Sequence, residues 1–261
     1  MKPLAEMRDA GRIKGLLFDI DDTLTTGGVL TAEAYSAMER LKRAGRLVVP
    51  ITGRPAGWCD HFARMWPVDA VVGENGAFYF AYSGGRLHKR FMDDAATRAA
   101  MRARLSDIAQ RILKEVPGCA IVSDQAYRET DLAIDFCEDV PALGLEAANR
   151  IRDLMQIEGM TARISSIHVN GWFGTYDKLA MSKLLFAERF KLDLVAANAG
   201  FAFAGDSPND APMFGFFDNS VGVANVRRFS DRLDTAPKFV TRAEAGEGFV
   251  ELVEHLLQGP G

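Results

Sequence analysis

Short apolar segments alternate with amphipathic helical segments in the first third of the chain, and this alternation constrains the fold more than any other feature. Residues 15–19 and 47–51 have the length and apolar character of buried strands. Residues 31–44 and 56–65 place apolar side chains at helical spacing, and a third strand is expected at residues 70–72. The order β-α-β-α-β predicts an α/β fold, a parallel sheet with helices on both faces.

The pattern changes near Gly76. Ser83-Gly84-Gly85 between two apolar segments predicts a hairpin, and the following order helix-strand-strand-helix-strand-strand indicates an α+β unit. We expect this unit to be inserted at about residues 82–172. The first pattern then returns, with helices expected at 178–190, 208–217 and 246–257 and strands at 201–204, 220–223 and 239–240. The first domain is therefore predicted to be split into residues 1–81 and 173–261.

Composition and charge exclude several classes of protein. The 261 residues include 31 Lys+Arg and 35 Asp+Glu, a net charge of −4, so the electrostatic support that nucleic-acid binding requires is missing. No apolar run approaches the roughly 18 residues of a membrane span, and residues 1–11 lack the apolar core of a signal peptide. Cys59, Cys119 and Cys137 are widely spaced and are expected to be reduced, buried thiols. These observations predict a cytoplasmic globular protein; its oligomeric state is left open.

Acidic side chains follow two of the predicted strands, at the sheet edge where open α/β proteins bind ligands. Asp19 and Asp21 come directly after the first strand, and two carboxylates so close repel each other unless a cation joins them. Asp206, after a later apolar strand, supplies a third oxygen donor. Carboxylate ligands without His or Cys indicate Mg²⁺. A single Asp here would more often cap a turn or helix, but three together favour a metal site.

Two further positions carry groups suited to an anion. Thr52-Gly53-Arg54 offers a hydroxyl and backbone N–H groups for a phosphate, although Thr52 alone also fits a turn hydroxyl. Lys178 falls in the first turn of a predicted helix, where a cation opposes the helix macrodipole. A bound anion would compensate for this placement, whereas a surface lysine would simply extend into solvent.

Polar residues near these clusters have both structural and functional interpretations. Ser207-Pro208-Asn209-Asp210 fits a capping box with Pro at the first helical position, and Asp210 and Asn209 could also support the metal or a lysine. Glu74-Asn75-Gly76 fits a plain turn, but Asn75 falls near the end of the third strand and could border the site. The four histidines show no metal-ligand spacing and are interpreted as structural.

Together these clusters resemble the four motifs of the haloacid dehalogenase (HAD) superfamily, in its phosphatase branch. The matching segments, in chain order, are Asp19-Ile20-Asp21-Asp22-Thr23 (DxDxT), Thr52-Gly53-Arg54-Pro55 in the form of the Cof-like subfamily, Lys178, and Gly205-Asp206-Ser207-Pro208-Asn209-Asp210 (GDSxND). Asp22 departs from the glycine that is commonest there. The resemblance implies a Rossmann-like core with an inserted type IIB cap of αββαββ order, as in sugar-phosphate phosphatases and phosphomannomutase.

The resemblance also implies a role for each motif residue. Asp19 would attack phosphorus and form an aspartyl-phosphate, and Asp21 would act as general acid and then general base. Mg²⁺ would be held by Asp19, Asp206 and the backbone carbonyl of Asp21. The remaining motif residues would bind phosphate (Thr52, Gly53 and Lys178) or orient the metal shell and the lysine (Asn209 and Asp210).

The expected function is a Mg²⁺-dependent phosphomonoester hydrolase for a small phosphorylated metabolite, a sugar phosphate or related acid. One alternative is a phosphomutase of the phosphomannomutase type, which needs a second phosphate clamp in the cap. Arg86, Lys89, Arg90 and Arg163 could form that clamp or could be ordinary surface charge. Another alternative is a non-catalytic HAD-like binding domain, against which the intact Asp19 and Asp21 argue.

Substrate contacts are expected from the cap and from the edge of the core. The segments 161–164 and 167–170 are predicted to run back toward the core and Lys178, which makes Arg163 and His168 candidate substrate contacts. Arg54 and Asn75 are the candidates in the core. The sequence does not identify the substrate, because specificity depends on how the cap closes.

Overall fold

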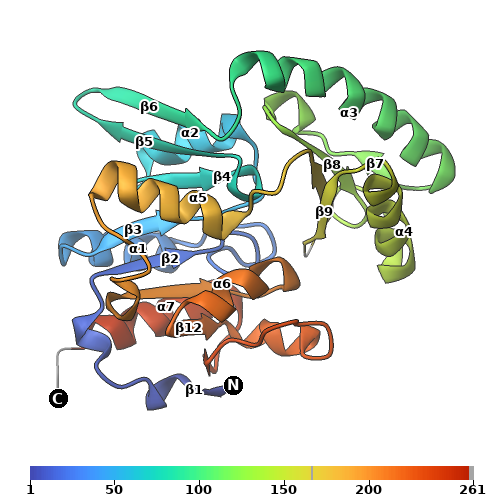
Figure 1. Cartoon of the computed structure of the whole chain (residues 1–261). Coiled ribbons are helices and arrows are strands. Elements are labelled where there is room, and N and C mark those ends of the chain that lie inside the picture. Colours follow the sequence, from blue (N-terminus) through green and yellow to red (C-terminus); the bar gives the residue numbers. More distant parts are fainter. Residues whose placement is uncertain (166, 259–261) are drawn as a thin grey trace.

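The structure, a computed structural model, describes residues 1–165 and 167–258 and consists of two units (Figure 1). The larger unit is built on a six-stranded sheet whose pairs are all parallel, which confirms the expected α/β core. In spatial order its strands are β1 (Lys2–Pro3), β13 (Phe239–Val240), β12 (Asn219–Gly222), β11 (Phe201–Gly205), β2 (Gly15–Phe18) and β3 (Leu47–Pro50). The sheet brings the end of β2 beside the end of β11, although the two strands are far apart in the sequence.

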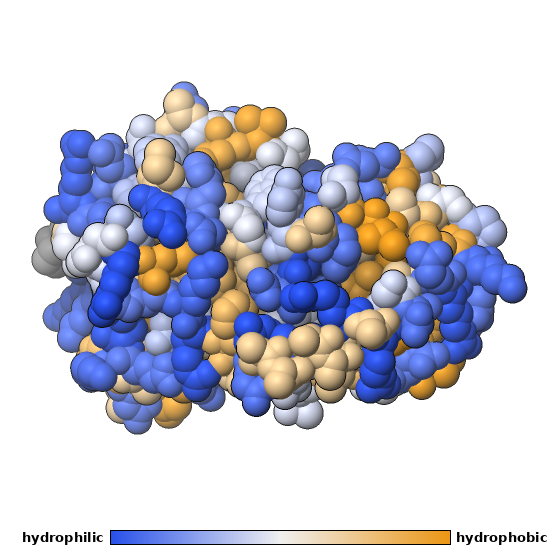
Figure 2. All heavy atoms as spheres, turned by 90° about the horizontal axis from the view of Figure 1, so that it is seen from above, coloured by the Kyte–Doolittle hydropathy of each residue, from blue (hydrophilic) through white to orange (hydrophobic). Residues whose placement is uncertain are grey.

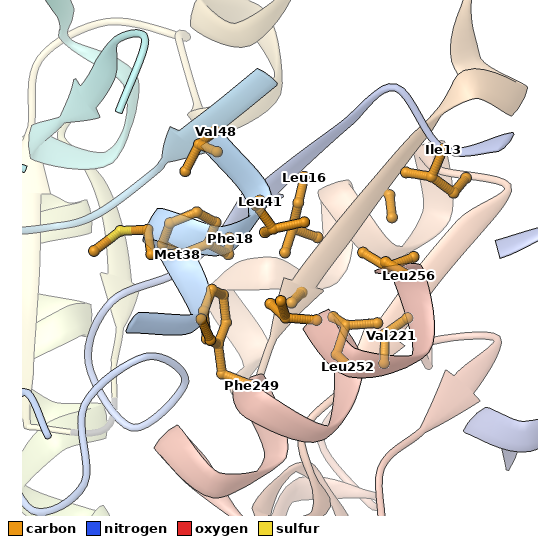
Figure 3. Close-up of a cluster of buried hydrophobic side chains, with 14 of the residues drawn as sticks. Ile13, Leu16, Phe18, Met38, Leu41, Val48, Val221, Phe249, Leu252 and Leu256 are labelled. Carbon is orange, nitrogen blue, oxygen red and sulfur yellow. The ribbon is translucent and has the colours of Figure 1, made fainter. Parts of the chain in front are cut away.

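Helices cover both faces of this sheet, as the strand sequences require. Leu16 and Phe18 point to one face and pack with α1 (Ala32–Arg43) and α7 (Ala245–Leu257), while Leu17 points to the other. Figure 3 shows the first of these clusters, with Phe18 beside Phe249. The opposite face is covered by α5 (Lys178–Leu185), a π-helical turn (Phe186–Phe190) and α6 (Ala211–Phe216). Because the central strands β2 and β11 are apolar on both sides, they are buried on both sides.

A small antiparallel sheet extends the core toward the second unit. Its strands are β4 (Val71–Gly73), β5 (Phe78–Ser83) and β6 (Arg86–Phe91), and α2 (Ala56–Met65) packs on them. The expected start of the insertion at residue 82 is therefore wrong, because it cuts through β5. Phe78 and Phe80 bury the hairpin against Phe62 of α2, and the turn signal in the sequence located the hairpin without revealing this partner.

The smaller unit, which we call the cap, follows this hairpin and has the αββαββ order. Its elements are α3 (Ala95–Glu115), β7 (Ala120–Ile121), β8 (Asp131–Asp135), α4 (Gly144–Ile157), β9 (Thr161–Ile164) and β10 (His168–Trp172). The strands form an antiparallel sheet in the order β7-β8-β10-β9, and both helices pack on it in a separate hydrophobic cluster. Figure 1 shows this unit in green to yellow, beside the core.

Several local details differ from the sequence predictions. Strand β1 was not expected, the predicted helix at 178–190 becomes π-helical after Leu185, and the one at 208–217 begins with a 3₁₀ turn. Among the described residues no disulfide joins the three thiols, and Cys119 and Cys137 are only partly buried, in contrast to Cys59. The 3₁₀ helices are Leu4–Glu6, Ala10–Arg12, Glu74–Gly76, Gln125–Tyr127, Asn198–Gly200, Pro208–Asp210 and Ala224–Phe229.

The face of the molecule seen in Figure 2 is mainly hydrophilic, with apolar patches scattered over it. Among the described residues, no helix combines the length and apolar character needed to cross a membrane.

Candidate active site

Three buried carboxylates meet at the carboxyl edge of the parallel sheet. Asp19 follows β2 and Asp206 follows β11, and the neighbouring strands bring them together with Asp210. Oxygen atoms from these three residues all lie within 4.8 Å of one another. Asp19 is 5% exposed, Asp206 1% and Asp210 0%, so solvent cannot separate their charges. This cluster has the donor chemistry of a Mg²⁺ site.

Lys178 is the cation that faces this cluster. Its Nζ donates hydrogen bonds to Asp19 and Asp210, both at 2.8 Å, and its side chain is buried. The lysine is the first residue of α5, whose Asp177 N-cap accepts the N–H of Ala180. The start of this helix lies so close to Gly76 that a Cβ there would stand 2.1 Å from the carbonyl oxygen of Asp177. The two carboxylates thus compensate for a cation placed at the positive end of a helix.

Burial strongly perturbs the ionisation of these groups. Burial raises the pKa of Asp19 to about 7, although Lys178 opposes the shift. Burial and the neighbouring Asp19 also raise the pKa of Asp206 well above its ordinary value. Burial disfavours the charged form of Lys178, but Asp19 and Asp210 outweigh it and raise the pKa of the lysine. Three carboxylates facing one lysine leave an excess of negative charge, which a divalent cation would neutralise.

Asp210 has the capping role that its sequence predicted. Its carboxylate accepts the N–H groups of Asp206 (3.1 Å) and Ser207 (3.4 Å), and the reciprocal contacts complete a capping box. Gly205 makes room for this contact, because a Cβ there would lie 2.4 Å from Oδ2 of Asp210. Oδ1 is left for Lys178. Asp210 therefore holds both the turn that carries Asp206 and the lysine.

The backbone conformation of the loop after β2 explains how Asp22 can stand where glycine is commonest. Its φ is 55°, in the left-handed region that glycine adopts without strain and that aspartate tolerates better than most residues. Asn225, which the sequence analysis missed, donates to the backbone carbonyl of Asp22 (2.9 Å) and to Asp206 (3.2 Å). Thr23 donates to the other oxygen of Asp206. These bonds fasten the loop to the carboxylate cluster.

Asp21 points away from the cluster and toward Arg54. The Nε of Arg54 donates to both carboxylate oxygens of Asp21, at 3.0 and 3.1 Å, and Nη2 donates to one of them at 2.8 Å. The guanidinium also lies over the ring of Trp58, 4.7 Å from its centroid. The side chain of Asp21 is thus separate from the three clustered carboxylates.

The same arginine connects the core to the cap. Its Nη2 also donates to Glu138 of the cap at 2.8 Å, and the other carboxylate oxygen of Glu138 lies 2.7 Å from Nε2 of His168. Arg54 was expected to be a substrate contact; in this arrangement its guanidinium is occupied by carboxylates of both units. His168 is buried; it pairs with Glu138 and also lines the cavity between the units.

A small cavity of about 20 Å³ lies between the two units at this point. Its lining consists of Asp19, Asp21, Gly53, Arg54, Ser165, Ile167, His168, Asn170, Ser207 and Asn209. A space of this size holds about one water molecule, so the structure represents a closed cap. An organic phosphate can enter only if the cap moves away from the core.

The other candidate residues lie around this cavity. The hydroxyl of Thr52 accepts the N–H of Arg54 at 3.0 Å, which is the turn role that was also considered. Asn75 is buried beside Gly53, and among the described residues its Nδ2 has no acceptor. Arg163 does not line the small cavity; it lines a larger cleft next to it.

The structure does not assemble the second phosphate clamp considered for a mutase. Arg86, Lys89 and Arg90 lie on β6, against the core rather than in the cap, while Arg163 lies on β9. Lys89 pairs with Asp60 of α2 at 3.3 Å. The three basic residues of β6 lie apart from the cap because the β5–β6 hairpin packs on α2 of the core.

Glu74 is an interface residue that the sequence analysis did not identify. Its buried carboxylate accepts the N–H groups of Ala56 in the core (3.0 Å) and of Glu129 (2.9 Å) and Thr130 (2.7 Å) in the cap. Arg128 adds a hydrogen bond from the cap to the carbonyl of Gly53 at 2.9 Å. The segment containing Glu74 had been interpreted as a plain turn, because nothing local signals a partner so distant in sequence.

Comparison with known proteins identifies the family. A sequence profile described as haloacid dehalogenase-like hydrolase matches residues 16–125, the segment that carries the first two motifs. This segment of the chain therefore matches the HAD superfamily. The match and a phosphatase relative support the expected class of enzyme, a hydrolase of the phosphatase type. The chain is also 26% identical to a phosphoglycolate phosphatase of Methanothrix thermoacetophila, over 94% of this chain and 97% of that protein.

Solved structures share the same fold over nearly the whole chain. A protein of Thermoplasma acidophilum matches with a TM-score of 0.71 at 17% identity, over 94% of this chain and 98% of that one. The C-terminal domain of trehalose-6-phosphate phosphatase from C. albicans matches with a TM-score of 0.69 at 13% identity, over 94% and 93%. The sucrose-phosphatase of Synechocystis sp., in complex with sucrose and phosphate, matches with a TM-score of 0.62 at 15% identity, over 94% and 98%. At these identities the likeness concerns the fold.

Proposed function

We propose that this HAD protein is a Mg²⁺-dependent phosphomonoesterase that acts on a small phosphorylated metabolite, a sugar phosphate or related acid, through an aspartyl-phosphate. The observation that carries the proposal is the pairing of Lys178 with Asp19, in a buried site that also holds Asp206. Asp21 stands two residues away and is held by a different cation, Arg54. The two aspartates therefore have separate environments, as two different chemical roles require.

Each residue has a defined step in this reaction. A carboxylate oxygen of Asp19 attacks phosphorus, the bond from phosphorus to the leaving oxygen breaks, and an aspartyl-phosphate forms. Asp21 gives its proton to the leaving oxygen and later takes a proton from the water that hydrolyses the aspartyl-phosphate. Lys178 offsets negative charge on the phosphoryl oxygens, with donors from Thr52 and Gly53.

The carboxylate cluster fits a resident Mg²⁺. Asp19 and Asp206 would hold the ion, with Asp210 and Asn209 fixing the surrounding turn, and the ion would neutralise phosphoryl charge. The chemistry of the donors supports this choice, because the three clustered groups are hard carboxylate oxygens without a thiolate or imidazole.

The names of the relatives support the substrate class. Phosphoglycolate, trehalose 6-phosphate and sucrose phosphate esters are small phosphate monoesters, and the corresponding phosphatases resemble this chain in sequence or fold. A hydrolase is favoured over a mutase because the basic residues considered for a second phosphate clamp lie apart. We propose no nucleic-acid or membrane partner.

Phosphate release from p-nitrophenyl phosphate and from a panel of phosphorylated metabolites, with Mg²⁺ and after exhaustive chelation, tests this function. We expect chelation to abolish turnover, and Asp19→Asn to abolish both turnover and an acid-labile phosphoenzyme. Asp107→Asn, on the exposed side of α3, is the matched control and should behave as wild type. Full activity after chelation contradicts the metal assignment, and wild-type turnover by Asp19→Asn contradicts the choice of nucleophile.

A further inference from the structure

A larger cleft of about 700 Å³ opens beside the closed catalytic cavity. Ser165 and Asn209 line both the cleft and the catalytic cavity, so the two spaces are adjacent. One wall of the cleft comes from α4 and β9 of the cap, and the other comes from the core segments around Pro208 and Phe229. A group leaving the phosphorus atom near Asp19 would therefore have this cleft next to it.

Arginines from both units face into this cleft. Arg163 projects from β9 of the cap and Arg232 from the core segment that follows the 3₁₀ helix Ala224–Phe229. Both side chains are exposed, and within the described part of the chain neither has a carboxylate in ion-pair range. Arg152 also lines the cleft but pairs with Asp153 at 2.7 Å. Among the described residues the lining includes one acid, Asp234, so the cleft has an excess of positive charge.

We propose that the cleft receives the leaving group of the substrate, and that Arg163 and Arg232 bind a second anionic group on it, a carboxylate or a second phosphate. This inference rests on the proposed phosphatase function and makes its substrate class narrower. Arginine binds both anions through paired N–H donors. A cleft of this volume lies within the range of small-molecule sites and accommodates a leaving group as large as a sugar. The substrate class is thus a phosphate monoester of a sugar acid, or a sugar bisphosphate.

The placement of the two arginines adds a consequence for specificity. Arg163 belongs to the cap and Arg232 to the core, so both can hold one anion only when the cap is closed. A substrate with a neutral leaving group leaves these two like charges in one cleft without a counter-ion. An anionic leaving group therefore favours the closed, water-excluding arrangement, whereas a neutral one does not.

Two matched substrates test the proposal on the full chain with Mg²⁺. 6-Phosphogluconate and sorbitol 6-phosphate differ only at C1, which is a carboxylate in the first and a hydroxymethyl group in the second. A hexitol 1,6-bisphosphate replaces the carboxylate by phosphate, and p-nitrophenyl phosphate measures the basal activity. The variants are Arg163→Gln, Arg232→Gln and the double variant. Arg150→Gln is the control, because Arg150 lies on the exposed side of α4 and pairs with Glu115 outside the cleft.

We expect the wild-type enzyme to have a higher kcat/KM for 6-phosphogluconate or for the hexitol 1,6-bisphosphate than for sorbitol 6-phosphate. The preferred substrate then identifies the second anion as a carboxylate or a phosphate. Each single variant should lower that kcat/KM about tenfold, the scale of one charge-assisted hydrogen bond. Hydrolysis of sorbitol 6-phosphate and p-nitrophenyl phosphate should stay within about twofold of wild type, as should all activities of the Arg150→Gln control.

Two results overturn this inference while leaving the proposed function intact. One is a wild-type enzyme that hydrolyses p-nitrophenyl phosphate but does not prefer an anionic leaving group. The other is a loss in the arginine variants that is equal for charged and neutral substrates. A wild-type protein that hydrolyses none of these esters contradicts the proposed function itself.

Discussion

Replacing Lys178 by methionine tests whether the lysine balances the buried carboxylates. Its Nζ lies 2.8 Å from both Asp19 and Asp210, and all three side chains are almost fully buried. Methionine fills a similar volume but leaves the carboxylates without their cation. Breaking a buried ion pair in this way costs about 3–5 kcal/mol of unfolding free energy. We expect that loss in EDTA at pH 8, measured by urea unfolding.

The loss should depend on pH in a definite direction. The pKa of Asp19, already raised to about 7 by burial, rises further without the lysine, whereas in the unfolded chain it returns to about 3.8. A group whose folded pKa is raised stabilises the protein at low pH and loses that contribution as pH rises. If the variant binds one more proton than wild type, lowering the pH from 8 to 6 recovers about 2–3 kcal/mol. Added Mg²⁺ should also restore stability, because it supplies positive charge to the folded state alone.

Lys183→Met is the matched control, since Lys183 is exposed on the same helix. Its Nζ lies over the ring of Phe216, so we expect a loss of about 1 kcal/mol or less. A Lys178→Met loss no larger than this control, and independent of pH, would refute the assignment of Lys178 as the counter-charge.

Three further predictions concern Asp21, the proposed acid–base group, and the contact between the units. Asp21→Asn should lower kcat/KM for alkyl phosphates by about 10²–10⁴-fold, and far less for p-nitrophenyl phosphate, because p-nitrophenolate departs without a proton; equal losses argue against an acid role. Glu74→Gln should lower the unfolding free energy by about 2–3 kcal/mol in urea titrations, because the new amide donor meets the N–H of Thr130. The control Glu39→Gln, on the surface of α1, should change the unfolding free energy by about 0.5 kcal/mol or less. The close contact with His168 and the pairing with Arg54 hold the pKa of Glu138 at about 2, below its ordinary 4.5. Its stabilising contribution is therefore complete above pH 4.5 and is lost as the pH falls toward 2. Thermal unfolding between pH 3 and 6 should therefore fall less steeply in Glu138→Gln, and identical slopes contradict this pairing.

The sequence predicted the core because its local signals and its tertiary structure agree. The apolar strand before Asp19 can be buried only in the middle of a parallel sheet, and the carboxyl ends of β2 and β11 then meet. Lys178 was noticeable because it contradicts the helix macrodipole, and the structure shows the carboxylates that compensate for it. The capping role of Asp210 was predictable because a capping box is a contact between near neighbours in sequence.

The contacts between the two units could not be predicted in the same way. Glu74 binds backbone groups 55 and 56 residues away, and Arg54 binds Glu138 at a separation of 84 residues. Such contacts depend on how the cap docks, which no local pattern encodes. The start of the insertion was misplaced for the same reason, since the β5–β6 hairpin is recognisable in sequence but its packing on α2 is not.

The order of the strands also determines when each unit can form during synthesis. The cap is one continuous stretch with its own hydrophobic cluster, so all its internal contacts are available once Trp172 has left the ribosome. The parallel sheet of the core cannot form all its contacts by then. Its strand β2 lies between β3 and β11, and β11 is made only after the whole cap. Until then one edge of β2, with Asp19 at its end, has no partner strand, and β1 pairs only later, when β13 has been made. The chain can thus complete the cap before it can assemble the sheet that carries Asp19.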